Sequence, residues 1–415
     1  MFPSVFTVRQ KFARPLVPDV VEEVPLQLAR LSLANVVKPG QSVAITAGSR
    51  GIANIATILR ACADYFKSLG AAPFIVPAMG SHGGATAEGQ LRVLASYGIT
   101  DVRMGCPIRS SMETIVVGQA AEGFAIYFDR QAFAADHVLV VNRVKSHTDY
   151  SGNLESGLAK MLLIGLGKHD GAKIYHRAIQ DFDFEQIVRS VGERVLSTCR
   201  IVAGLGIVEN AYDETARILA ITPGEFFERE AELLVQSKTW MARLPFDRVD
   251  LLVVDQIGKN ISGTGMDTNV IGRKFNSHQA IADEWPKVRR IYVRDLTPET
   301  HGNAAGIGCA EFCHRRVIDQ MDVEVTRINC LTSGGISGGM LPFDYPNDRA
   351  ALEAALPTVG LTEPPNAKLL WIKNTLDLEE VECGAAYWDA AKGRDDLEVI
   401  STLRELPFDN RDDLI

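Results

Sequence analysis

A glycine-rich segment between Asn142 and His176 concentrates side chains that can transfer protons, bind metals or form covalent bonds. It carries three of the eight histidines of the 415-residue chain, His147, His169 and His176, together with four lysines. Imidazole exchanges protons near neutral pH and binds soft to borderline metals. A partly desolvated lysine can serve as a nucleophile or a covalent anchor. The segment is therefore predicted to belong to a reaction site.

Two other loops carry candidate groups. Arg50, in SRGIAN, follows a predicted strand and precedes a predicted helix, where a guanidinium beside free amides suits a carboxylate or phosphate. His82 lies among glycines that would let a ligand approach its ring. His147 ends a third predicted strand in a similar way. On neighbouring strand ends, the two imidazoles could flank a small substrate from opposite faces, as a racemase requires. Taken singly, each of these residues could also be an ordinary surface or turn residue.

The elements that must position these loops are short apolar strands that alternate with longer helical patterns. Strands are predicted at Ser42–Thr46, Phe74–Pro77 and Val138–Val141, and helices at about 53–69, from Thr86, at 155–164 and at 184–196. This order is typical of an α/β domain with a largely parallel sheet. Because ligands bind beyond the carboxyl ends of such strands, the three loops are expected to converge on one edge of one sheet.

A second series of elements follows LPFDRVD. Strands are predicted at Leu251–Val254, Arg290–Val293, Val323–Ile328, Leu369–Ile372 and Leu397–Ile400, and helices near 303–321 and 379–391. The expected fold class is α/β, with two α/β domains, largely parallel or mixed sheets, and an active-site cleft between the domains. The N-terminal domain is expected to span residues 1–247 and the C-terminal domain residues 248–395. A tail of about residues 396–415 could return to the N-terminal domain.

Composition and missing motifs argue against several classes of protein. A net charge of −9 without a long basic run is not the footprint of a nucleic-acid binder. No apolar stretch approaches the roughly 18 residues that cross a membrane, and no secretory signal pattern is present. Seven scattered cysteines indicate reduced thiols, so a cytoplasmic protein is expected. No strict GxGxxG, HExxH, GxSxG or paired CxxC occurs, which disfavours standard dinucleotide folds, metallopeptidases and serine hydrolases.

Together the motifs SRG, GSHGGAT and SHTDYSG…GLAK, followed by His176, resemble those of nickel-dependent lactate racemase and related 2-hydroxyacid racemases and epimerases. The resemblance covers most of the chain and is most specific over Ala47–His176. In that family the cofactor is a nickel-pincer nucleotide, a pyridinium mononucleotide whose sulfur and carbon atoms hold nickel. One lysine joins it through a thioamide, and a histidine completes the coordination of the metal.

Matching positions imply a role for each candidate residue. The implied roles are covalent anchor for Lys160, nickel ligand for His176, acid and base for His82 and His147, and substrate binding for Arg50, Gln256 and Lys259. The last two, in DQIGK, are similar to a glutamine–lysine pair of the family's second domain. Ala47 and Ile164 replace an acidic residue and a proline that the family carries. Three extra residues separate His147 from Lys160, which leaves Lys168 as an alternative anchor.

The resemblance implies a racemase or epimerase of a 2-hydroxy acid that works by reversible hydride transfer. Lactate, malate, a longer or aromatic 2-hydroxy acid and a sugar acid are the candidate substrates. Proteins that make the cofactor are expected partners, whereas nucleic acid and membranes are not. Two alternatives stay open: a zinc- or iron-dependent hydrolase or lyase that uses His82, His147 and His176 as ligands, and a binding homologue without cofactor.

Overall fold

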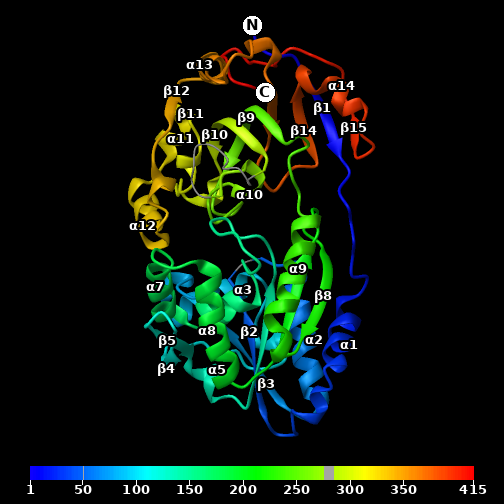
Figure 1. Cartoon of the computed structure of the whole chain (residues 1–415), viewed down its shortest axis with the longest axis vertical. Coiled ribbons are helices and arrows are strands. Elements are labelled where there is room, and N and C mark those ends of the chain that lie inside the picture. The colour runs from blue at the N-terminus through cyan, green and yellow to red at the C-terminus, as the bar shows by residue number, and fades with distance from the viewer. Residues whose placement is uncertain (50, 275–284) are drawn as a thin grey trace. The chain divides into compact units, whose positions relative to one another are not determined.

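The computed structural model describes residues 1–49, 51–274 and 285–415, and it divides into two compact units (Figure 1). The N-terminal unit comprises Ala13–His147 and Ser151–Met241. The C-terminal unit comprises Met1–Phe12, Thr148–Tyr150 and Ala242–Ile415. Each unit has its own sheet, accompanied by helices. The α/β fold class expected from the sequence is confirmed.

The N-terminal unit is built on a five-stranded sheet with the spatial order β3-β2-β6-β7-β8. Its strands are β2 (Ser42–Ala47), β3 (Ala72–Pro77), β6 (His137–Arg143), β7 (Ile201–Glu209) and β8 (Thr215–Ile221). The first four are parallel, and β8 is antiparallel to β7. The central strand β6 contains the buried run Val138–Val141, as expected of a parallel strand that is covered on both faces.

The remaining elements of this unit surround that sheet. They are α1 (Val20–Arg30), α2 (Ile55–Ser68), α3 (Ala87–Ser96), α4 (Asp101–Met104), β4 (Thr114–Gln119), β5 (Ala125–Asp129), α5 (Arg130–Ala134), α6 (Leu158–Lys160), a π-helix at Met161–Gly165, α7 (Lys168–Ala178), α8 (Phe184–Thr198) and α9 (Phe226–Trp240). Strands β4 and β5 form a separate antiparallel pair. Among the described residues of the whole chain, no helix combines the length and the apolar character that a membrane crossing requires.

Alternate residues of β7 face opposite layers of helices. Ala203 and Leu205 belong to a core that includes residues of α1 and α2. Gly204 faces the other way, where a Cβ would lie only 2.8 Å from Leu158 of α6 and from Phe226 of α9. The missing side chain therefore lets α6, which ends at the candidate lysine, approach the sheet closely.

The C-terminal unit is built on an eight-stranded mixed sheet with the order β12-β11-β10-β9-β13-β14-β1-β15. The strands are β1 (Val5–Gln10), β9 (Arg248–Ile257), β10 (Lys287–Leu296), β11 (Phe312–His314), β12 (Phe343–Tyr345), β13 (Leu369–Ile372), β14 (Glu380–Gly384) and β15 (Leu397–Val399). Its helices are α10 (Thr268–Ile271), α11 (Arg315–Gln320), α12 (Val323–Ser333), α13 (Asp348–Ala355) and α14 (Trp388–Lys392). The strands from β12 to β13 are parallel, and β14, β1 and β15 extend the sheet through antiparallel pairs.

The two ends of the chain pair with each other in this sheet. Strand β1 lies between β14 and β15, with Val8 opposite both Val381 and Val399 (Figure 1). The tail at 396–415, whose return to the N-terminal domain had been left open, therefore belongs to the C-terminal unit, and residues 1–12 join it there. The chain passes between the units after Met241, whereas the expected boundary followed residue 247.

Three local predictions in the C-terminal unit were wrong. The β-branched run at 323–328 was predicted as a strand, but it opens α12, whose first turn is capped when Asp322 accepts the N–H of Val325. The expected helix at 303–321 contains β11 and only the short α11, and the one at 379–391 begins as β14.

Candidate active site

Three loops of the N-terminal unit leave its sheet at the same edge. Strands β3, β2 and β6 are parallel, so their carboxyl ends share the edge at which open α/β sheets bind ligands. His82 follows β3 and His147 follows β6. Because β2 lies between these strands, their ends are about 10 Å apart, twice the usual strand spacing. The expectation that the two histidines follow adjacent strands was therefore wrong.

Lys160 ends a turn that is held by polar groups on both sides. Asn142, in β6, donates from Nδ2 to the carbonyl of Gly157 at 2.9 Å. Glu230 of α9, which is 1% exposed, accepts the N–H of Ala159 at 2.7 Å. A Cβ on Gly157 would collide with Oε1 of Glu230, so this position requires glycine. These contacts fix the backbone that presents Lys160.

Glu230 should make the stability of the protein depend on pH. Burial raises the pKa of Glu230 to about 8, although the N–H groups of Ala159 and Leu158 act in the opposite direction. The folded chain thus keeps a proton that the unfolded chain releases above its ordinary pKa of 4.5. The free energy of unfolding should therefore fall as pH rises between these two values, by up to about 1.4 kcal/mol per pH unit from this group.

The variant Glu230→Gln keeps an acceptor for Ala159 but cannot titrate. Thermal unfolding near about pH 5 and about pH 9 should show the variant close to the wild type in acid and more stable than the wild type in base. An identical pH dependence for both proteins would show that another group is responsible.

The π-helix that follows Lys160 contacts the loops after β2 and β3. A Cβ on Gly48 would lie 3.2 Å from Cε of Met161. The N–H of Gly80 donates to the carbonyl of Gly165 at 3.3 Å, and the φ of +58° at Gly80 favours glycine there. π-helical turns are rare and recur at functional sites. The structure thus brings the Lys160 segment together with two of the three loops expected to converge.

His176 lies on α7, and the charge of Lys160 acts on it electrostatically. Ala172, one turn earlier on the helix, would lie 3.7 Å from a Cβ on Gly80, so this face of α7 is turned toward the loop of His82. Burial and the positive charge of Lys160 both lower the pKa of His176, which favours the neutral imidazole. Its Nδ1 is buried, and no described residue reaches it with a hydrogen bond. Only the neutral ring can donate a lone pair to a metal.

Lys168, the alternative anchor, is fully buried and engaged. Its Nζ lies 3.0 Å from Oδ2 of Asp129 and 3.2 Å from Oε1 of Gln90, and it also donates to the carbonyl of Pro77. Burial lowers the pKa of Lys168, whereas Asp129 raises it. Because two hydrogen bonds and an ion pair enclose its Nζ inside the core, Lys168 is not available for a covalent bond. Lys160, which is partly exposed, is the stronger candidate.

The two candidate acid–base histidines have different surroundings. His82 is exposed, and its N–H donates to the carbonyl of Met79 at 3.1 Å. The N–H of His147 donates to Oε2 of the buried Glu155 at 2.7 Å, and its ring centroid lies 5.7 Å from that of Phe184. The backbone of His147 is thus fixed by a buried carboxylate. The acid and base roles of both residues stay predictions.

The remaining candidate residues are those expected to bind the substrate. Arg50 lies outside the described residues. Gln256 belongs to β9 of the C-terminal unit, where its N–H donates to the carbonyl of Lys373 at 2.9 Å. Lys259 follows β9 and donates from Nζ to the carbonyl of Gly263. Both side chains are partly exposed, and their contact with a substrate stays a prediction.

Comparison with known proteins was made at the level of sequence and of structure. No protein-family model and no curated protein sequence matches the chain. Among solved structures, the lactate racemase apoprotein from Thermoanaerobacterium thermosaccharolyticum matches with a TM-score of 0.55 over 89% of this chain and 93% of that chain. The fold is similar to that of a lactate racemase. With 12% sequence identity, the likeness extends to the fold and no further.

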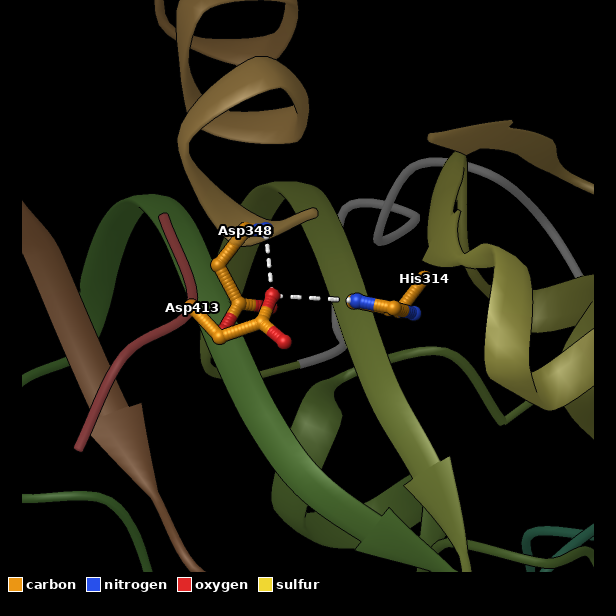
Figure 2. A group of neighbouring side chains, drawn as sticks. All are labelled: His314, Asp348 and Asp413. Atoms are coloured by element: carbon orange, nitrogen blue, oxygen red, sulfur yellow. Dashed lines mark hydrogen bonds and ion pairs between the residues drawn. The ribbon is translucent and has the colours of Figure 1, made fainter. Parts of the chain in front are cut away.

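Among the described residues, a single group has metal-ligating atoms close enough together to share an ion, and it lies in the C-terminal unit. Its members are His314, Asp348 and Asp413, whose ligand atoms lie within 4.8 Å of one another. Figure 2 shows the carboxylate of Asp413 between the ring of His314, at 3.1 Å, and the N–H of Asp348, at 3.1 Å. None of His82, His147 and His176, the ligands of the alternative hydrolase, belongs to this group.

The atoms of this group are already engaged by protein donors. Arg294 donates to Oδ2 of Asp348 at 2.7 Å, and Arg316 donates to Oδ2 of Asp413 at 2.8 Å. Nδ1 of His314 accepts the N–H of Arg316 at 3.0 Å, so Nε2 is left to donate to Asp413. The group is therefore a clamp that holds the C-terminal residues in place.

Removing the carboxylate of Asp348 from this clamp should destabilise the protein. Burial acts to raise the pKa of Asp348, but Arg294 and Tyr292 outweigh it and the pKa is lowered. The stabilisation is therefore present above the ordinary pKa of 3.8 and is lost as pH falls below it. Near neutral pH, Asp348→Asn should cost about 3–5 kcal/mol in denaturant unfolding, because Arg294 loses a buried partner. The exposed Asp395→Asn serves as the control; an equal effect of both changes would contradict the clamp.

Some residues that hold the candidate site were not anticipated from the sequence. Glu230 had a detectable signal, because it lies with Phe226 and Leu233 on the buried face of α9, where a charge is out of place. Gln90 gave no signal of its own, because Lys168, which fixes its amide, lies 78 residues away in the sequence.

Proposed function

We propose that this chain is a racemase or epimerase of a 2-hydroxy acid that works with a nickel-pincer nucleotide. The observation that carries the proposal is the effect of Lys160 on His176: partial burial and the positive charge of Lys160 both lower the pKa of this imidazole, whose Nδ1 is buried. The likeness of the fold to a lactate racemase supports it. Proteins that make the cofactor would be its partners, and we expect the protein to work in the cytoplasm.

The residues present fit such a cofactor. Lys160 would hold it through a covalent bond, and His176 would donate a ring nitrogen to nickel. When bound, the cofactor would supply the group that accepts and returns a hydride. The lowered pKa of His176 fits this role, since a ligating imidazole must be unprotonated.

The remaining candidates would act on the substrate itself. One of His82 and His147 would take the proton of the substrate hydroxyl, and the other would do so for the opposite enantiomer. Arg50, Gln256 and Lys259 would hold the carboxylate and keep the reacting carbon in place.

The proposal is tested on protein produced in cells that also make the cofactor. Intact-mass measurement should show a covalent addition, elemental analysis should show nickel, and a screen of chiral 2-hydroxy acids should find one that racemises. Racemisation in deuterated water should leave the hydrogen on the α-carbon unexchanged, because a hydride passes to the cofactor and back. Zinc or iron without added mass would instead favour the metal-dependent hydrolase or lyase. Protein that contains no metal and turns over no substrate would instead favour the binding homologue.

A further inference from the structure

A buried chain of hydrogen bonds leads from the start of α7 to the loop of His82. Lys168, the first residue of α7, and Gln90, in α3, are both fully buried. Lys168 Nζ lies 3.2 Å from Oε1 of Gln90. From its other end, Nε2 of Gln90 donates to the carbonyl of Gly80 at 3.0 Å and lies 3.4 Å from the carbonyl of His82. One amide thus spans the distance between α7 and this loop.

The orientation of the Gln90 amide is determined by its neighbours. The ammonium group of Lys168 can only donate, so the amide oxygen of Gln90 must face it. The carbonyls of Gly80 and His82 can only accept, so the amide nitrogen must face them. Asp129 holds Lys168 in turn, at 3.0 Å. A flipped amide would place like groups together at both ends, and Lys168 therefore locks Gln90 in the orientation that grips the loop.

The loop needs such a grip because its own sequence does not favour a single conformation. Gly80, Gly83 and Gly84 have φ of +58°, +69° and +68°, and Ala85 has +54°. Glycines lose more conformational freedom on ordering than other residues do. His82 is exposed in the middle of this segment, so core packing of its own ring does not fix it. The backbone on either side of it therefore contributes to its position.

We propose that Gln90 is a positioning residue for His82, with Lys168 fixing the amide that holds the loop. Because Lys168 also begins the helix that carries His176, the same network ties the proton-transferring loop to the helix of the metal ligand. The effect on catalysis rests on the proposed function. The grip on the loop does not, and it can be measured without activity.

The test compares Gln90→Met with Leu94→Ala, a change to a fully buried side chain one turn later on the same helix. Amide hydrogen exchange of residues 79–86 should become about tenfold faster in Gln90→Met, the change expected when a net hydrogen bond is lost. In Leu94→Ala the unfolding temperature should fall while exchange of this loop stays at the wild-type rate. Gln90→Asn, whose shorter amide cannot span the gap, replaces Gln90→Met if that variant does not fold.

In the cofactor-loaded enzyme, Gln90→Met should lower kcat by about tenfold with little change in KM, since the substrate-binding groups are untouched. Unchanged exchange at 79–86 in both Gln90 variants would overturn the inference. So would an equal acceleration in Leu94→Ala, because the effect would then be general loss of structure. Faster loop exchange in a protein whose wild type racemises nothing would uphold the grip and refute the proposed function alone.

Discussion

Lys160→Ala, produced in cells that make the cofactor, should carry no added covalent mass, retain little nickel and lose racemase activity by about a thousandfold or more. A thioamide needs a primary amine, and alanine has none. His176 alone offers one nitrogen to the metal, which is too few donors to hold it. Intact-mass spectrometry and elemental analysis measure the first two losses directly, and chiral chromatography measures the third.

The matched control for this variant is Lys173→Ala. Lys173 lies on α7 close to His176, but it is exposed. This change removes a positive charge near the site and should leave mass, nickel and activity at wild-type levels. If Lys160→Ala kept the added mass, the anchor would lie elsewhere and the proposed pairing with His176 would be wrong.

His82→Ala and His147→Ala should each lower racemisation of both enantiomers by about 10²–10⁴-fold, the usual contribution of a positioned acid or base. Full racemisation requires both imidazoles, because one serves each face of the substrate. Each variant should nevertheless still oxidise one enantiomer, using the histidine that remains. The two variants should therefore prefer opposite enantiomers when the 2-oxo acid is trapped in a single turnover.

Nickel content must be equal in these proteins and in wild type for the comparison to hold. His301→Asn, a change to an exposed histidine of the C-terminal unit, is the control for the loss of an imidazole. Asparagine tolerates the left-handed backbone at this position, where φ is +49°. If both variants oxidised the same enantiomer, the assignment of one histidine to each face would be refuted.

The sequence was most informative where burial leaves a continuous apolar pattern. The strands at β2, β3 and β6 were predicted because parallel strands covered on both faces are apolar throughout, and their loops could then be placed on one edge. The start of α12 was missed because the β-branched residues Val323, Val325 and Ile328 favour a strand, although all three are exposed on a helix. The local sequence pattern does not show which tertiary contacts a segment makes in the folded protein.

The candidate site was predictable in its residue types but not in its supports. The sequence assigned the anchor to Lys160 but left Lys168 as an alternative, because what engages Lys168 is an ion pair with Asp129 and a bond to Gln90, both remote along the chain. The position of β2 between the strands that precede His82 and His147 was also missed, since strand order depends on pairing between distant segments. Contacts between segments that are distant in the sequence leave no pattern in the local sequence.

The pairing of β1 with β14 and β15 limits how this protein can be divided. A fragment that starts at Ala242 would lack the strand that satisfies the backbone groups of both neighbours, and two unpaired edges would be open to aggregation. A fragment that ends at Met241 would contain β1 without its partners β14 and β15. Expression of either half by itself should therefore give poorly soluble material, whereas a circular permutant that links residue 415 to residue 1 keeps every strand beside its partner.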